Sequence, residues 1–379
     1  MNMDDLLRDA ELKSQRYRNF LGNRVSGALM VNISCDYERW IEKQRAAGII
    51  GQPNIEIPDP MTEDFLAEHA FNWGAQHVRD AQLASRFHME ELEDDFCSTI
   101  CFHPGAGYQA AMSSGGDLLF FKGMGTSYTI GPVLADWDRM DAVFNHDNQW
   151  VHYAKGFWRG VDSVDARGVF VAPRFCRSPL DLANDLRGDR LFMDLYDFPD
   201  EVSAFVGKCA DSIIAIDKIL RADSATLRNN PGGALGVASG HQTILMNGDP
   251  LDLISDEMVL QFNNPALETV THYAPSTYLH HHSIGIARVR AVSMVRNLTV
   301  QQLTQDPNGP RIADCISDEL IDASLCTPIH LMLSANQIQG SYEAFVEKLL
   351  RGRFILDLWV SNFDEGRWFV RQARRITGQ

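Results

Sequence analysis

The sequence alternates short apolar runs with longer amphipathic stretches from about residue 100 onward, and this pattern most constrains its fold. Residues 168–173 (GVFVAP) predict a short buried strand. Residues 178–188 begin with Ser-Pro and end with Gly, which is typical of a helix. Residues 200–222 place their apolar side chains on one helical stripe. Repeated units of this kind indicate a largely parallel sheet with helices between its strands.

The same reasoning predicts further strands and helices. The strands are expected at residues 234–238, 277–282, 298–303, 328–333 and 354–360, and the helices at 255–270, from 285, at 340–350 and at 364–376. Six to eight such units favour one closed (β/α)8 TIM barrel over an open sheet. We therefore expect a single α/β domain over residues 1–379, with residues 1–20 as a helical extension. The remainder of the first hundred residues reads as irregular.

Composition excludes several classes of protein. Fifty acidic residues against 34 lysines and arginines give a formal net charge of -16, which disfavours nucleic acid and anionic membrane surfaces as partners. No apolar run approaches the roughly 18–20 residues of a membrane span, and residues 1–18 lack the apolar core of a secretory signal. Seven cysteines without a C-x-x-C motif predict a reduced, cytoplasmic chain.

Three segments carry a resemblance to a known family. Residues 177–205 (RSPLDLANDLRGDRLFMDLYDFPDEVSAF), 247–265 (NGDPLDLISDEMVLQFNNP) and 278–285 (YLHHHSIG) resemble passages of the uroporphyrinogen decarboxylase superfamily. The resemblance implies a distorted (β/α)8 barrel. It also implies either porphyrinogen decarboxylation or zinc-dependent methyl transfer to thiols or from corrinoids. Sites of such barrels lie at the carboxyl ends of the strands.

The decarboxylase activity itself is not expected. Decarboxylases of this family carry an arginine-rich motif near the N-terminus that grips the propionates of the tetrapyrrole, because several carboxylates require several guanidinium groups. The corresponding residues 27–40 (GALMVNISCDYERW) contain one arginine, Arg39. We therefore expect a branch that has lost this chemistry.

Three consecutive histidines mark the expected site. His280 and His282 share one face of a predicted strand, so both imidazoles can reach one metal ion. In the methyltransferase branch a similar H-x-C pair binds zinc, and His282 stands where that branch has cysteine. Residues 359–362 (WVSN) also lack the family's remaining cysteine ligand. A third ligand could come from His241, from His103 or from a carboxylate such as Asp249. The alternatives are a polar pocket without metal and a purely structural role.

Other residues near predicted strand ends complete the candidate set. We expect catalytic roles for Asp249 and His281, and substrate binding by Arg174, Asn32 and His103. For Arg174 the alternative is a salt bridge on the rim, and for Asp249 it is a loop cap.

The sequence thus predicts a methyltransferase-like barrel enzyme that uses zinc, with a small-molecule substrate and a corrinoid protein as the partner that the resemblance implies. One alternative is a lyase or hydrolase that acts on a small carboxylated compound. Another is a barrel that binds a tetrapyrrole or corrinoid without catalysis. A homodimer is left open.

Overall fold

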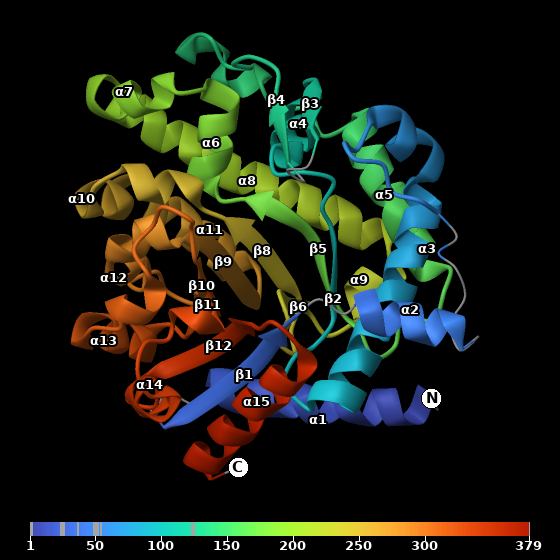
Figure 1. Cartoon of the computed structure of the whole chain (residues 1–379). Coiled ribbons are helices and arrows are strands. Elements are labelled where there is room, and N and C mark those ends of the chain that lie inside the picture. The colour runs from blue at the N-terminus through green and yellow to red at the C-terminus, as the bar shows by residue number, and fades with distance from the viewer. Residues whose placement is uncertain are drawn as a thin grey trace.

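Eight parallel strands form one curled sheet in the computed structural model, which describes residues 3–22, 27–35, 38–47, 53, 55–122 and 126–378 (Figure 1). Their order along the sheet is β1 (Ala28–Ser34), β12 (Arg353–Trp359), β11 (Ile329–Ser334), β10 (Val300–Thr304), β9 (Ser276–His282), β8 (Thr243–Asn247), β5 (Phe170–Arg177) and β2 (Thr99–Phe102). From β2 to β12 the neighbouring strands of this sheet follow one another in the chain, apart from short antiparallel hairpins, so helical segments connect them as the alternating sequence pattern predicts. The first strand, β1, is the exception, because it pairs with the last strand, β12, and not with β2.

Most of the helices lie on the outer face of the sheet (Figure 1). The longer ones are α1 (Met3–Gly22), α2 (Glu38–Ala46), α3 (Glu63–Phe87), α5 (Gln149–Asp162), α6 (Pro179–Arg187), α7 (Arg190–Asp197), α8 (Pro199–Asp223), α11 (Asn264–Tyr273), α13 (Asp318–Cys326), α14 (Tyr342–Leu349) and α15 (Phe363–Thr377). Side-chain caps set several of their starts. Ser178 accepts the N–H of Asp181 at the start of α6, and Asn362 accepts that of Glu365 in α15.

The expected closed barrel is only partly realised, because β1 and β2 form no ladder with each other. Two carboxylates bridge this gap, which we call the seam. Asp95 accepts the backbone N–H of Val31 and Asp94 accepts that of Ile33, each at 2.8 Å. The N–H of Asp95 in turn donates to the carbonyl of Val31 at 2.9 Å. Side-chain carboxylates thus accept hydrogen bonds from backbone N–H groups on the edge of β1. In a closed barrel a neighbouring strand would accept them.

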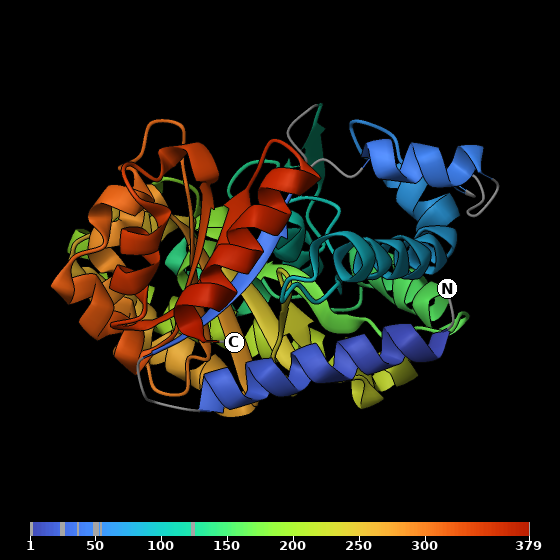
Figure 2. The same ribbon diagram turned by 60° about the horizontal axis from the view of Figure 1, so that its bottom comes forward.

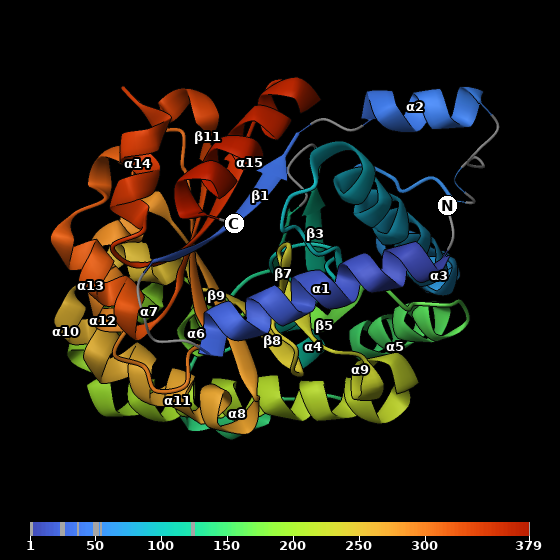
Figure 3. The ribbon, with the colours of Figure 1, turned by 90° about the horizontal axis from the view of Figure 1, so that it is seen from below.

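Helix α1 lies across the amino ends of the strands (Figures 2 and 3). Its Tyr17 and Phe20 pack against the inner face of the sheet, in a cluster with Phe170, Tyr278 and Ile355. Lys13 and Arg16 of the same helix lie beside the acidic seam, and Arg16 contacts Asp95 at 2.5 Å. The helix therefore fills the floor of the curled sheet, and this leaves the carboxyl ends of the strands as its opening.

Two expectations about local structure were wrong. Residues 234–238 form the β6 (Gly233–Ala234) and β7 (Val237–Ala238) hairpin, and the strand of the main sheet is β8, further along the chain. The first hundred residues are not irregular, since α1 and the 25-residue α3 occupy much of them. Helix α1 matches the expected N-terminal helix. The prediction of one domain over the whole chain stays a prediction.

Two further properties bear on the expected environment. The seven cysteines are free thiols. Within the described ranges, none of the helices combines the length and the apolar character that a membrane crossing requires.

Candidate functional site

The inner face of the sheet changes character toward the carboxyl ends of the strands. Its lower layer is apolar and buried, but the side chains above it are partly open to solvent. We call this upper region the mouth. It is lined by Ser34, Cys101, Phe175, Asn247, His280, His282, Thr304, Met332 and Trp359. Solvent therefore enters the curled sheet from this end, where the resemblance predicts a site.

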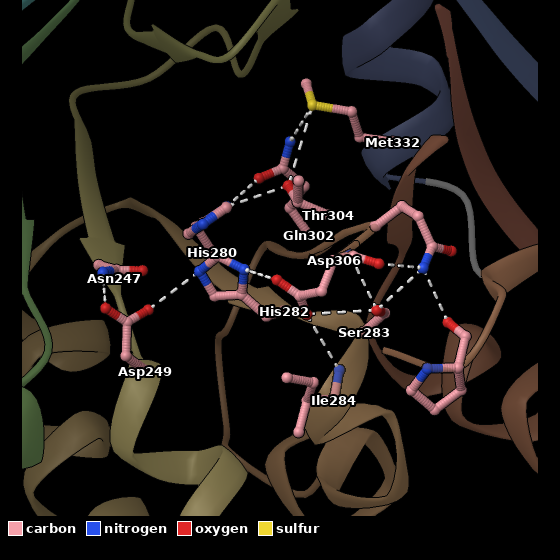
Figure 4. A network of polar contacts seen from close by, with 12 residues as sticks. Asn247, Asp249, His280, His282, Ser283, Ile284, Gln302, Thr304, Asp306 and Met332 are labelled. Atoms are coloured by element: carbon pink, nitrogen blue, oxygen red, sulfur yellow. Dashed lines mark hydrogen bonds and ion pairs between the residues drawn. The ribbon is translucent and has the colours of Figure 1, made fainter. Parts of the chain in front are cut away.

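His282 is held between two carboxylates at the mouth (Figure 4). Its Nδ1 donates to Asp306 at 2.8 Å, and its Nε2 lies 3.2 Å from Asp249. The contact with Asp249 raises the pKa of His282 to about 9, although partial burial opposes this, and Asp306 adds to it. His282 is therefore an imidazolium at neutral pH, with a proton on each ring nitrogen.

Asp249 joins the histidine to a second group of charges. Its other oxygen accepts a hydrogen bond from Asn247 at 2.7 Å and one from Arg177 at 2.9 Å. Burial alone would raise the pKa of Asp249, but His282 and Arg177 hold it well below its usual range. The carboxylate thus stays ionised, and its side chain is 43% exposed.

His280 has the opposite electrostatic character. Its pKa is lowered to about 4, mainly by burial and also by the nearby charge of His282, although the hydrogen bond to Gln302 opposes this. Its Nδ1 contacts the carbonyl oxygen of Gln302, which can only accept a hydrogen bond. The neutral ring must then carry its proton on Nδ1, so its Nε2 holds a lone pair. The rings of His280 and His282 lie 4.9 Å apart (Figure 4).

Two more titratable groups border this pair. The ring of His103, just after β2, lies 5.0 Å from that of Phe175, which in turn lies 5.6 Å from His280. The pKa of His103 is lowered to about 4, first by burial and then by Arg177 and His280. The pKa of Asp252 is raised to about 7, first by burial and then by Asp249, although His282 opposes this. The pKa values of His103 and Asp252 therefore depend on the charges of the residues at the mouth.

A side pocket of about 460 Å³ opens beside Asp249. Arg177 lines it together with Asp181 and Asp185, and its guanidinium bonds to both of these carboxylates as well as to Asp249. Tyr128, Phe192 and Leu253 supply apolar lining. Because three carboxylates already occupy the one arginine, this pocket offers no free cation to an anionic substrate.

Arg174 does not lie on the wall of the mouth, contrary to the prediction. Phe102 of β2 pairs with Arg174 whereas Cys101 pairs with Ala172, so Pro173 is an extra residue that forms a bulge. The bulge reverses which side chains face inward. Arg174 therefore points outward and bonds to Gln109 and to the carbonyl of Ile213, while Phe175 faces the mouth.

Three other predicted residues lie elsewhere. His281 is fully buried on the opposite side of β9 from its two neighbours, so the expected catalytic role has no geometric support. Asn32 is fully buried below the mouth and bonds to Tyr17 at 2.9 Å, which makes it part of the packing under α1. His241 precedes β8. Six residues separate it from Asn247, or roughly 20 Å along a strand, so it lies toward the opposite end of the sheet.

The arrangement does not fit the expected zinc site. Among the described residues, no group of three or more His, Cys, Asp or Glu side chains is placed to hold a metal ion. Both ring nitrogens of His282 already face carboxylates, and the expected ligand His241 is distant. A zinc ion would have to displace the Nε2 proton of His282. We therefore derive no chemical step through a metal.

The structure adds residues that the sequence reasoning missed. Asp306 follows β10 by two residues, and Gln302 lies within it, in register with His280. Arg177 ends β5. A polar residue at or just after a strand end was the available signal for Asp306 and Arg177. Gln302, inside an apolar run, could be recognised only from its neighbour across the strands. The side chain of Arg39 lies outside the described residues.

Comparison with models of known protein families and with curated proteins found no match to this chain.

Proposed function

We propose that the chain is an enzyme, built on an incompletely closed TIM-like barrel, that moves protons on a small polar substrate as a lyase or a hydrolase. The single observation that carries this proposal is the pairing of a cationic with a neutral histidine, His282 and His280, at the open end of the sheet. Two titratable groups whose surroundings push their pKa values apart form an acid and a base.

Each histidine has a distinct role in this proposal. Asp306 holds Nδ1–H of His282 and fixes the ring, while the Nε2 proton faces Asp249 at the edge of the side pocket. A substrate oxygen that replaces this contact accepts the proton, so His282 acts as general acid. His280 accepts a proton at Nε2 from water or from a substrate carbon or hydroxyl, so it acts as general base.

The charges at the mouth argue against the carboxylated substrate that the sequence suggested. Arg174 points away, and Arg177 is saturated by three aspartates. We therefore propose a substrate without a carboxylate. Zinc-dependent methyl transfer, a corrinoid partner, a non-catalytic tetrapyrrole-binding barrel and a cytoplasmic location stay predictions.

A substrate survey with matched variants tests the proposal. The protein is incubated with a library of neutral and hydroxylated small molecules, and dehydration or hydrolysis products are followed by mass spectrometry. We expect at least one conversion that His280→Gln and His282→Gln each reduce by about a hundredfold or more, whereas His152→Gln, a change at an exposed position on α5, retains it. Conversion that survives both substitutions would contradict the proposal.

A further inference from the structure

The carboxylate that fixes His282 is itself held from its far side. Asp306 lies two residues after the end of β10, and its Oδ1 accepts the Nδ1–H of His282 at 2.8 Å. Its Oδ2 accepts two further hydrogen bonds, from the hydroxyl of Ser283 and from the backbone N–H of Ile284, each at 3.2 Å (Figure 4). The carboxyl group of an aspartate turns easily about its terminal torsion, so these two donors restrict the direction in which Asp306 faces the histidine.

Ser283 holds the main chain of Asp306 as well as its carboxylate. It directly follows His282 and is fully buried. Its hydroxyl oxygen accepts the backbone N–H of Asp306 at 3.0 Å, while its proton is donated to Oδ2 of the same residue. The loop after Asp306 passes directly over this hydroxyl, because a Cβ at Gly309 would lie only 2.3 Å from the serine oxygen. Ser283 therefore links the end of β9 to the loop that follows β10.

Gln305 supports the same loop from within. Its Nε2 donates to the carbonyl oxygens of Asp306 and Pro310, at 2.8 Å and 3.0 Å, and its Oε1 accepts the N–H of Ile312 at 2.8 Å. One side-chain amide thus joins three backbone groups of the loop that carries Asp306. Together with the contacts of Ser283, these bonds fix the place of the carboxylate relative to His282.

The two ring nitrogens of His282 have unequal surroundings. The Nδ1 contact with Asp306 is 2.8 Å long, whereas the Nε2 contact with Asp249 is 3.2 Å long. The side chain of Asp306 is 17% exposed and that of Asp249 is 43% exposed. The Nδ1 side is therefore the more enclosed and the more tightly bonded, and the Nε2 side is the one that a substrate can reach.

We propose that Ser283 and Gln305 are positioning residues that act through Asp306 and keep one proton of His282 on Nδ1, so that the ring exchanges only its Nε2 proton with a substrate. In this transfer the N–H bond at Nε2 breaks, the proton goes to a substrate oxygen, and the electron pair stays on Nε2. The product is a neutral ring protonated at Nδ1. This inference rests on the proposed function, since it concerns the same general acid.

The neutral form of His282 tests the inference, because only that form has its single proton on one nitrogen or the other. The ¹⁵N resonances of its ring, assigned in full-length protein with His282→Gln, are recorded above about pH 9, where the ring loses its charge. We expect the wild type to carry the proton on Nδ1. In Ser283→Ala the ratio of the Nδ1–H to the Nε2–H tautomer should fall about fivefold or more, the effect of one hydrogen bond. Gln305→Met should lower this ratio too.

A matched control and the wild type itself keep the inference open to refutation. Ser334, the last residue of β11, takes no part in the contacts of Asp306, so Ser334→Ala should keep the wild-type ratio. A wild-type ring that carries its neutral-state proton on Nε2 overturns the inference, even if the variants do not fold. An unchanged ratio in Ser283→Ala, or an equal fall in Ser334→Ala, overturns it as well.

Failure of the proposed function gives a different result. A wild-type His282 that loses its charge near pH 6.5, the ordinary value, contradicts the general-acid role. The tautomer ratio of the neutral ring would still report on Ser283 in that case. Conversely, a ring that stays charged to about pH 9 but shows no tautomer change in Ser283→Ala leaves the acid–base proposal standing and removes only the positioning role.

Discussion

At the scale of single residues, His282 owes its charge to its two aspartates. Its folded pKa of about 9 lies above the ordinary value of 6.5. The stabilisation from charging this ring is therefore fully present below pH 6.5 and is lost as the pH rises through about 9. Asp249, Asp306, Asp252, His280 and His281 are the described titratable groups that act on the ring or respond to it.

This linkage gives a prediction for the His282→Gln variant. Its free energy of unfolding should fall below that of the wild type by about 2 kcal/mol under mildly acidic conditions, after allowance for solvent screening. The difference should shrink as the pH rises toward 10. Urea unfolding across this range measures it, and His152→Gln is the control. If the difference in unfolding free energy between the two proteins does not vary with pH, Asp249 and Asp306 do not raise the pKa of His282.

A second residue-scale prediction concerns Arg177. In Arg177→Met, Asp181 and Asp185 remain buried without their cation, so we expect a loss of about 3–5 kcal/mol in the free energy of unfolding. Arg167→Met removes an exposed ion pair with Asp165 and should cost less than about 1 kcal/mol. Comparable losses in the two variants, measured by chemical denaturation, would contradict the role given to the buried cluster.

At the scale of elements, the seam replaces a strand ladder with side chains. In Asp94→Ala, the N–H of Ile33 would lose its acceptor and His88 its carboxylate partner. We expect faster hydrogen exchange at Ile33 and a loss of about 2 kcal/mol in stability. Asp211→Ala, at an exposed position on α8, is the control. Unchanged protection of Ile33 would mean that the seam is held by other contacts.

The bulge at Pro173 shows why strand alternation misplaced one wall of the site. Counting from Phe170, strict alternation puts Arg174 inside and Phe175 outside, and one extra residue reverses both. Nothing in the local sequence other than the proline marks the inserted residue. In β9, which has no bulge, alternation placed His280 and His282 correctly on one face.

At the scale of the whole molecule, the predicted α/β order of elements from β5 onward agrees with the structure, with β8 as the main exception. Apolar runs and capping residues such as Ser178 and Asn362 encode these elements locally. The open seam was not predictable, because it depends on Asp94 and Asp95 meeting β1, more than sixty positions earlier in the chain. The pairing of Gln302 with His280 likewise depends on the register between strands.

The zinc content of the purified protein distinguishes the proposed metal-free acid–base enzyme from a zinc-dependent methyltransferase. We expect protein purified without chelator to contain well below one equivalent of zinc, because both nitrogens of His282 are engaged by carboxylates. Elemental analysis of the wild type measures this, with His280→Gln and His282→Gln for comparison. One equivalent of zinc that both variants lose would favour the methyltransferase reading instead.

The central claim is that, at neutral pH, His282 is cationic and His280 is neutral although the centres of their rings lie 4.9 Å apart. Nuclear magnetic resonance of ¹⁵N-labelled histidine side chains, assigned with His280→Gln and His282→Gln, measures both titrations in the intact protein. We predict that His282 remains protonated until the pH reaches about 9, whereas His280 stays neutral, with its proton on Nδ1, down to about pH 4. Two rings that titrate together near 6.5 would contradict it.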